Sequence, residues 1–158
     1  MNTKLQPWIT LVCRVVLGGV LLAAGLLKVQ HPAKSAMAVR AYEVLPISVA
    51  NVLGYALPWI EVGIALLLIL GIWVRWSAVA GSALLFLFIV AIAQAWARGL
   101  SIDCGCFGGG GQVAAGQTKY LEEILRDTGL IALGVFLFRF PHGKFGLDRV
   151  PEVESTQR

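Results

Sequence analysis

The sequence WSAVAGSALLFLFIVAIAQAWA, residues 76–97, contains no charged side chain and decides the fold class. A membrane-spanning helix needs about 20 consecutive apolar residues, and this stretch is long enough. Backbone groups in hydrocarbon must be paired within the protein, and the alternating pattern of membrane β-barrel strands does not occur here. The stretch therefore predicts a transmembrane α-helix.

The whole chain has the composition of an integral membrane protein. Its 158 residues are 58% hydrophobic and 14% charged, whereas an average soluble domain is about 45–50% apolar and about 25% charged. Three further apolar stretches predict spans near residues 8–27, 52–74 and 121–140. We therefore predict an all-α, integral membrane four-helix bundle over residues 1–150, followed by a disordered tail at 151–158.

A short amphipathic segment follows the first predicted span. Pro32 suits the first turn of a helix. Between Ala33 and Leu45 the apolar residues fall on one face, opposite Lys34 and Arg40. This pattern predicts a short interfacial helix.

Two cysteines stand one residue apart in the loop between the third and fourth predicted spans. Cys104 and Cys106 occur in the run SIDCGCFG, residues 101–108. A C-x-C pair can close into a small strained disulfide ring, and strained, exposed disulfides are the labile or catalytic ones. The pair predicts a thiol–disulfide exchange site. A structural staple and half of a metal site are the alternatives.

A metal site is the weaker of these interpretations. A tetrahedral zinc site needs four ligands, and only His31 and Asp103 could join the two sulfurs on that side of the membrane. We therefore predict no metal. The net charge of +4 fits the basic flanks of membrane spans, and we expect no nucleic-acid partner.

An even number of spans places both termini on one side of the membrane, and the dithiol loop and interfacial helix on the other. Lysines and arginines are almost equally divided between the two sides, so the positive-inside rule does not decide the orientation. Disulfide exchange with exported proteins belongs in an oxidising compartment. We predict a multi-pass protein of the cell (plasma) membrane with cytoplasmic termini and an extracytoplasmic Cys104–Cys106 loop.

Charges and small residues near the loop bear on its chemistry. Asp103 precedes Cys104 and opposes its thiolate, so Cys106 is the better thiolate on charge alone. Phe107 and Gly108 begin a glycine run that predicts a docking surface for a partner's backbone, or simply a flexible loop. Cations nearby would favour either thiolate, and the candidates are Lys28, Arg98 and Arg126.

The first and second predicted spans each contain one charged residue. Arg14 and Glu61 are each costly in hydrocarbon unless they are paired or hydrated. We predict a buried Arg14–Glu61 pair that fixes helix packing, with a quinone contact or a proton route as the alternative. Cys13 is expected to be a packed, inert thiol. The Cys104–Cys106 pair would then pass electrons to a second protein or to a quinone.

Five stretches in a fixed order carry a family resemblance: residues 14–28, 41–46, 57–61, 103–108 and 126–127. From about Trp8 to Phe140, the chain resembles the MauE/DoxX family of redox-associated membrane proteins. The resemblance implies a membrane component of a thiol–disulfide pathway with a thioredoxin-fold, DsbA-like partner. MauE-like proteins are implicated in methylamine utilisation, where they support disulfide formation in an exported dehydrogenase subunit. No residue of this chain indicates that methylamine is involved.

Two functions follow from these observations. The first is a membrane thiol–disulfide redox protein that exchanges disulfides through its C-x-C pair with an exported thioredoxin-fold partner and passes electrons to a quinone. The second is a non-catalytic assembly or scaffold subunit of a membrane oxidoreductase, with a structural disulfide. The sequence leaves open whether the chain alone is an enzyme, the direction of electron flow and the oligomeric state.

Overall fold

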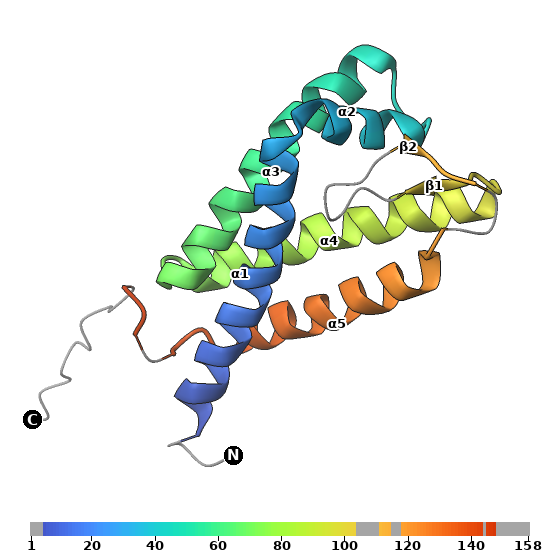
Figure 1. Ribbon diagram of the computed structural model, residues 1–158. Helices are drawn as coiled ribbons and strands as arrows, with labels where there is room; N and C mark the ends of the chain where they lie inside the picture. Colours follow the sequence, from blue (N-terminus) through green and yellow to red (C-terminus); the bar gives the residue numbers. More distant parts are fainter. Residues whose placement is uncertain (1–4, 104–110, 115–117, 144, 148–158) are drawn as a thin grey trace, which may run out of the picture.

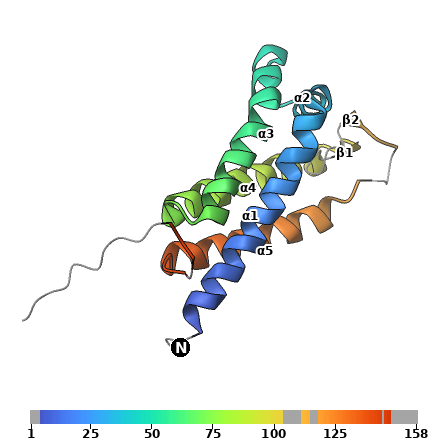
Figure 2. The same cartoon turned by 60° about the vertical axis from the view of Figure 1, so that its left-hand side comes forward.

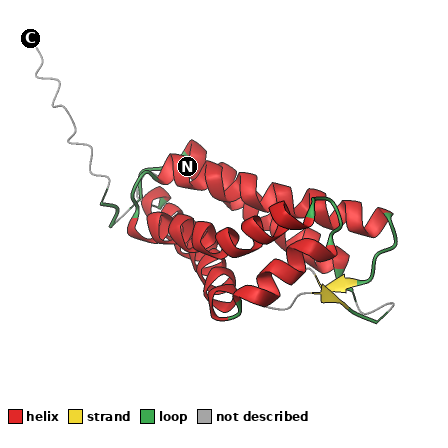
Figure 3. Ribbon diagram, turned by 90° about the horizontal axis from the view of Figure 1, so that it is seen from above, coloured by secondary structure: helices red, strands yellow, loops and turns green. Residues whose placement is uncertain are grey.

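The structure, a computed structural model, describes residues 5–103, 111–114, 118–143 and 145–147. Most of these residues are helical, which confirms the all-α prediction for the described part of the chain. Two short strands pair as an antiparallel hairpin that was not predicted (Figure 3). The elements in order are α1 (Gln6–Gln30), α2 (Pro32–Ala41), α3 (Ile47–Leu70), α4 (Val74–Ala97), β1 (Ile102–Asp103), β2 (Gly111–Gln112) and α5 (Tyr120–Arg139).

Three of the helices, α1, α3 and α4, are long and apolar enough to cross a membrane, with mean hydropathies of 2.2, 2.0 and 2.2. In the most apolar 18-residue segment of each helix, less than half of the residues are buried within the chain: 44%, 28% and 28% for α1, α3 and α4. Many large apolar side chains therefore face outward, as expected where lipid covers them. The chain is a helical membrane protein.

The fourth predicted span, α5, is not among these three apolar helices. Its first half carries four charged residues, which lower its hydropathy. It nevertheless runs beside α4 over much of its length (Figure 1). The charged residues of that half are Glu122, Glu123, Arg126 and Asp127.

The four long helices form two pairs, α1 with α3 and α4 with α5. The two pairs lie at an angle to each other in both ribbon views (Figures 1 and 2). Apolar side chains from all four helices fill the space between the pairs. Their close packing helps to hold the pairs together, because lipid tails are as apolar as these side chains and supply no hydrophobic driving force. The buried members of this core include Leu17, Leu21, Leu68, Leu85, Leu130 and Leu137.

The two ends of the fold bring different segments together. At one end, the Leu147 N–H donates to the Leu70 carbonyl at 3.2 Å, and the Thr10 hydroxyl donates to the Phe140 carbonyl at 3.2 Å. We call this the terminal end, because α1 begins and α3 and α5 finish there. At the other end, which we call the hairpin end, α2 packs against β1 and β2. The topology across the membrane, including the side that each end faces, stays a prediction.

The boundary between the second and third spans differs from the prediction. The second span was expected at 52–74, but α3 occupies Ile47–Leu70 and α4 begins at Val74. Gly71 has φ 70° and its N–H donates to the Leu67 and Leu68 carbonyls, an arrangement that ends a helix and that glycine adopts most easily. The connection between the two helices therefore lies before Arg75, the residue between the predicted spans 52–74 and 76–97.

Two glycines allow α1 to approach α3 closely. A Cβ atom on Gly18 would lie 3.1 Å from the Ala65 carbonyl oxygen, and one on Gly25 would lie 2.7 Å from a methyl group of Val62. Residues seven apart share a helix face. Small residues on such a face let transmembrane helices pack backbone to backbone.

Replacing Gly25 by valine is expected to destabilise the protein by about 1–3 kcal/mol, because the added atoms force α1 away from α3. The free energy of unfolding of the purified chain in detergent measures the effect. Gly19→Val is the matched control, because a Cβ on Gly19 meets nothing within 4 Å. Equal losses of stability in the two variants would contradict the close α1–α3 contact.

Candidate functional site

The candidate thiol site is bounded by the β hairpin. Ile102 pairs with Gln112 and Asp103 pairs with Gly111 in antiparallel register. The ends of the intervening segment are thereby held beside each other. The residues predicted for exchange and docking belong to that segment and lie outside the described residues: Cys104, Cys106, Phe107 and Gly108.

The hairpin is packed firmly onto the helices around it. Ile102 is 1% exposed and joins a small second core with residues of α4 and α5. The Tyr120 hydroxyl donates to the Leu100 carbonyl. A Cβ on Gly111, which has φ 110°, would lie 3.1 Å from the Met37 sulfur on α2. The ends of the dithiol segment therefore have fixed positions at the hairpin end.

The charges predicted to act near the dithiol divide into two groups. Arg98 and Asp103 lie at the hairpin end, where Arg98 makes an exposed ion pair with Glu43 at 3.1 Å. Lys28 instead makes an ion pair between α1 and α3, and Arg126 makes one within α5. The influence of these groups on a thiolate stays a prediction.

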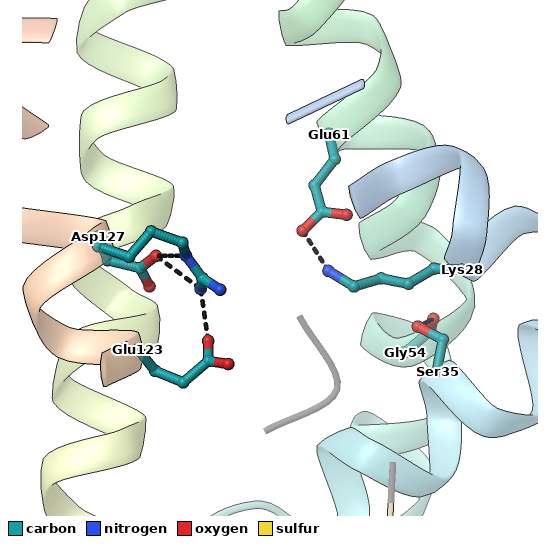
Figure 4. A network of polar contacts seen from close by, with 7 residues as sticks. Lys28, Ser35, Gly54, Glu61, Glu123 and Asp127 are labelled. Carbon is teal, nitrogen blue, oxygen red and sulfur yellow. Dashed lines mark hydrogen bonds and ion pairs between the residues drawn. The ribbon is translucent and has the colours of Figure 1, made fainter. Parts of the chain in front are cut away.

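Lys28 and Glu61 form a buried ion pair between α1 and α3 (Figure 4). The Lys28 Nζ atom lies 2.5 Å from Glu61 Oε1, and the two side chains are 4% and 0% exposed. Side chains on a helix tilt toward its N-terminus. Because α1 and α3 run in opposite directions, Lys28 and Glu61 tilt toward each other and close the pair. The Lys28 ammonium also lies 5.2 Å from the centre of the Phe88 ring.

The predicted Arg14–Glu61 pair is not formed. Arg14 is 1% exposed, and its Nε and Nη2 atoms donate to the Leu68 and Ile69 carbonyls at 2.9 and 3.0 Å. By the same tilt, Arg14 and Glu61 point away from each other. Arg14 thus caps the C-terminal end of α3, where the helix dipole favours a cation.

Cys13 lies in the main apolar core and is 8% exposed. The predicted burial of the Cys13 thiol is therefore confirmed. Its neighbours in the core are apolar side chains of several helices, and such surroundings make a thiol inert.

A second charged group lies on α5. Arg126 Nη2 lies 2.5 Å from Glu123 Oε2 and 2.8 Å from Asp127 Oδ1 (Figure 4). Asp127 is fully buried, whereas the side chains of Arg126 and Glu123 are 28% and 21% exposed. Residues 126–127 formed part of the family resemblance, but the sequence did not show that the Asp127 carboxylate is fully buried.

A small cavity separates the two charged groups. Its volume is about 20 Å³, and Lys28, Glu61, Arg126 and Asp127 line it together with apolar side chains that include Phe88. A cavity of this size holds about one water molecule. Glu61 Oε2 and Asp127 Oδ2 have no hydrogen-bond partner among the described residues. Four charged side chains thus gather around a small cavity whose wall is mostly apolar.

These features define a class: a polytopic helical membrane protein with an ion pair buried between two of its helices and with a C-x-C sequence between the two strands of a hairpin. Within this class the chain belongs to the MauE family. The family's profile, described as methylamine utilisation protein MauE, matches residues 6–140. The MauE resemblance is therefore confirmed, and a relation to DoxX stays a prediction.

Two relatives are similar to a large part of the chain. The methylamine utilization protein MauE of Paracoccus denitrificans is 36% identical over 107 residues, which cover 67% of this chain and 58% of the relative. The protein of the same name from Methylorubrum extorquens is 36% identical over 106 residues, 66% of this chain and 57% of the relative. The chain thus spans less than two thirds of the length of these relatives. No solved structure matches it significantly.

Proposed function

We propose that this chain is a membrane accessory protein of methylamine utilisation that exchanges disulfides with an exported thioredoxin-fold protein through Cys104 and Cys106. The family and the names of two relatives support the methylamine context. The C-x-C sequence supports the chemistry, since one sulfur can be attacked while the other resolves the mixed disulfide.

The proposed reaction is a pair of thiol–disulfide exchanges. A thiolate of the reduced partner attacks one sulfur of the Cys104–Cys106 disulfide, so that the S–S bond breaks and a mixed disulfide forms. The second partner thiolate then displaces the remaining sulfur, which leaves the partner oxidised and the chain as a dithiol. An acceptor of the quinone class takes up the two electrons and two protons when the disulfide forms again.

The observation that carries this proposal is the pairing of Asp103 with Gly111. It holds the two ends of the cysteine segment together at the hairpin end, against α2. The cysteine segment is therefore connected to the described fold at two neighbouring residues, Asp103 and Gly111. Cys13 is buried in the apolar core, so the exchange relies on Cys104 and Cys106 alone.

Thiol labelling in intact cells tests the proposal. After mild reduction, a membrane-impermeant maleimide is expected to modify Cys104 and Cys106 from the outer side, and without reduction it is expected to modify neither. A variant with Cys104→Ser and Cys106→Ser is the control, because its one remaining cysteine, Cys13, is buried. Labelling that requires permeabilised cells would contradict the proposal. A disulfide that resists mild reduction would favour the scaffold function instead.

A further inference from the structure

We propose that Met37 and Val44 form a docking surface for the exported thioredoxin-fold partner, beside the hairpin whose strands flank the C-x-C sequence. This inference rests on the proposed function, because a protein that exchanges disulfides with the two cysteines must lie against the residues around the ends of their segment. Those ends are Asp103 and Gly111, which pair across the hairpin. The exposed residues that flank them therefore define where the partner docks.

Met37 lies beside one end of the cysteine segment. Its helix, α2, packs against both strands of the hairpin (Figure 1), and a Cβ on Gly111 would lie 3.1 Å from the Met37 sulfur. Met37 is nevertheless 45% exposed. A methionine side chain is flexible and polarizable, so it adapts to an apolar surface that approaches it. Met37 thus offers a partner an apolar contact directly beside the reactive segment.

The turn that carries Val44 packs near the other end of the cysteine segment. Ala41 and Tyr42, at the start of this turn, pack against the second core, which contains Ile102 of β1. Val44 is 57% exposed, and Leu45, which follows it, is 40% exposed. Neighbouring exposed apolar side chains mark a surface that another molecule covers. Apolar contacts are therefore available near both ends of the segment.

The turn that carries Val44 is held in one conformation by the end of α4. The Tyr42 carbonyl accepts hydrogen bonds from Gln94 at 3.2 Å and from Arg98 at 3.3 Å. Arg98 also forms an ion pair with Glu43 at 3.1 Å. Glu43 has φ 51°, a left-handed conformation that a residue with a side chain keeps only where its surroundings enforce it. Val44 is therefore presented in a fixed position, which lowers the entropic cost of docking on it.

Polar groups around this surface indicate that it lies outside the hydrocarbon of the membrane. The side chains of Arg98 and Glu43 are 44% and 52% exposed, and Arg40 donates to Asn51 in a second exposed contact, at 2.7 Å. Charged side chains are costly in hydrocarbon, so these residues belong at or beyond the lipid headgroups. An apolar centre with a polar rim is the usual composition of a protein–protein interface.

Rate measurements with two reductants test the docking surface. The purified chain, with its C-x-C disulfide formed, is mixed either with a reduced exported thioredoxin-fold protein of the DsbA type or with dithiothreitol, which needs no docking surface. Met37→Glu and Val44→Glu are each expected to slow the reaction with the protein about tenfold or more, because an unpaired charge buried in the interface opposes docking. The reaction with dithiothreitol should keep the wild-type rate. Leu5→Glu is the matched control, since Leu5 is 59% exposed and precedes α1 at the terminal end.

Wild-type rates with the protein in both Met37→Glu and Val44→Glu would overturn the docking surface and leave the proposed function intact. Equal slowing with the protein and with dithiothreitol in Val44→Glu would also overturn it, because the change would then act on the disulfide itself. Slowing that occurs in lipid nanodiscs but not in detergent micelles would assign the surface to lipid. A wild-type chain that reacts with dithiothreitol but not with the protein would contradict the proposed function, and the docking surface with it.

Discussion

Replacing either Cys104 or Cys106 by serine is expected to lower the rate of disulfide exchange to the uncatalysed level. A serine hydroxyl forms no disulfide, so the variant lacks either the sulfur that is attacked or the sulfur that resolves the intermediate. The measurement is the rate at which the purified chain oxidises a reduced thioredoxin-fold protein in the presence of a soluble quinone. Neither residue belongs to a predicted span, so we expect the variants to insert and fold normally.

Cys13→Ala is the matched control for these variants. It removes a thiol that is 8% exposed and packed in the apolar core, and we expect the exchange rate to stay at the wild-type level. Wild-type rates in both Cys104→Ser and Cys106→Ser would show that the dithiol is not the exchange site. The scaffold function would then be the better interpretation of the chain.

Lys28→Met is expected to destabilise the protein by about 3–5 kcal/mol, the cost of breaking a buried ion pair by removing one partner. The methionine fills most of the lysine volume, but it leaves the Glu61 carboxylate without its buried cation. The free energy of unfolding in detergent measures the loss.

Two further variants distinguish a buried pair from a general effect of removing charge. Arg98→Met breaks an ion pair whose side chains are 44% and 52% exposed, so a loss below about 1 kcal/mol is expected. Combining Lys28→Met with Glu61→Leu should recover most of the lost stability, because apolar residues of similar size replace the whole pair. A loss in Lys28→Met no larger than that in Arg98→Met would contradict the buried pair.

The apolar runs predicted the helices well because the thickness of a bilayer sets the length of a spanning segment. The first, third and fourth predicted spans lie within two residues of α1, α4 and α5 at their starts. The second was displaced because Gly71, inside a continuous apolar run, ends α3 through its left-handed backbone. An apolar run cannot reveal a turn that depends on the conformation of one glycine.

The hairpin escaped prediction for a different reason. Strands of two residues each are too short to show an alternating pattern. Their pairing depends on packing against α2 and against the second core around Ile102, which brings together segments distant in sequence. The reactive cysteines could therefore be predicted from their spacing, whereas the arrangement that holds the ends of their segment could not.

The partners of the buried charges could not be predicted from the sequence. Arg14 and Glu61 lie inside the first two predicted spans, and the cost of an unpaired charge in hydrocarbon suggested that they pair with each other. Helix direction decides the partner instead, because side chains tilt toward the N-terminus of their own helix. In the antiparallel α1 and α3, Lys28 tilts toward Glu61, and Arg14 tilts toward the carbonyls at the end of α3.

The most direct test of disulfide exchange is to trap its covalent intermediate. Each variant, Cys104→Ser or Cys106→Ser, is first treated with an aromatic disulfide, which converts its remaining loop thiol into a mixed disulfide. A reduced thioredoxin-fold protein that has lost its own resolving cysteine is then added, so that its thiolate displaces the aromatic thiolate, and the products are weighed by mass spectrometry. We predict that one of the two variants accumulates a one-to-one mixed disulfide that a reductant cleaves. If neither variant forms a covalent complex, Cys104 and Cys106 do not exchange disulfides with such a protein.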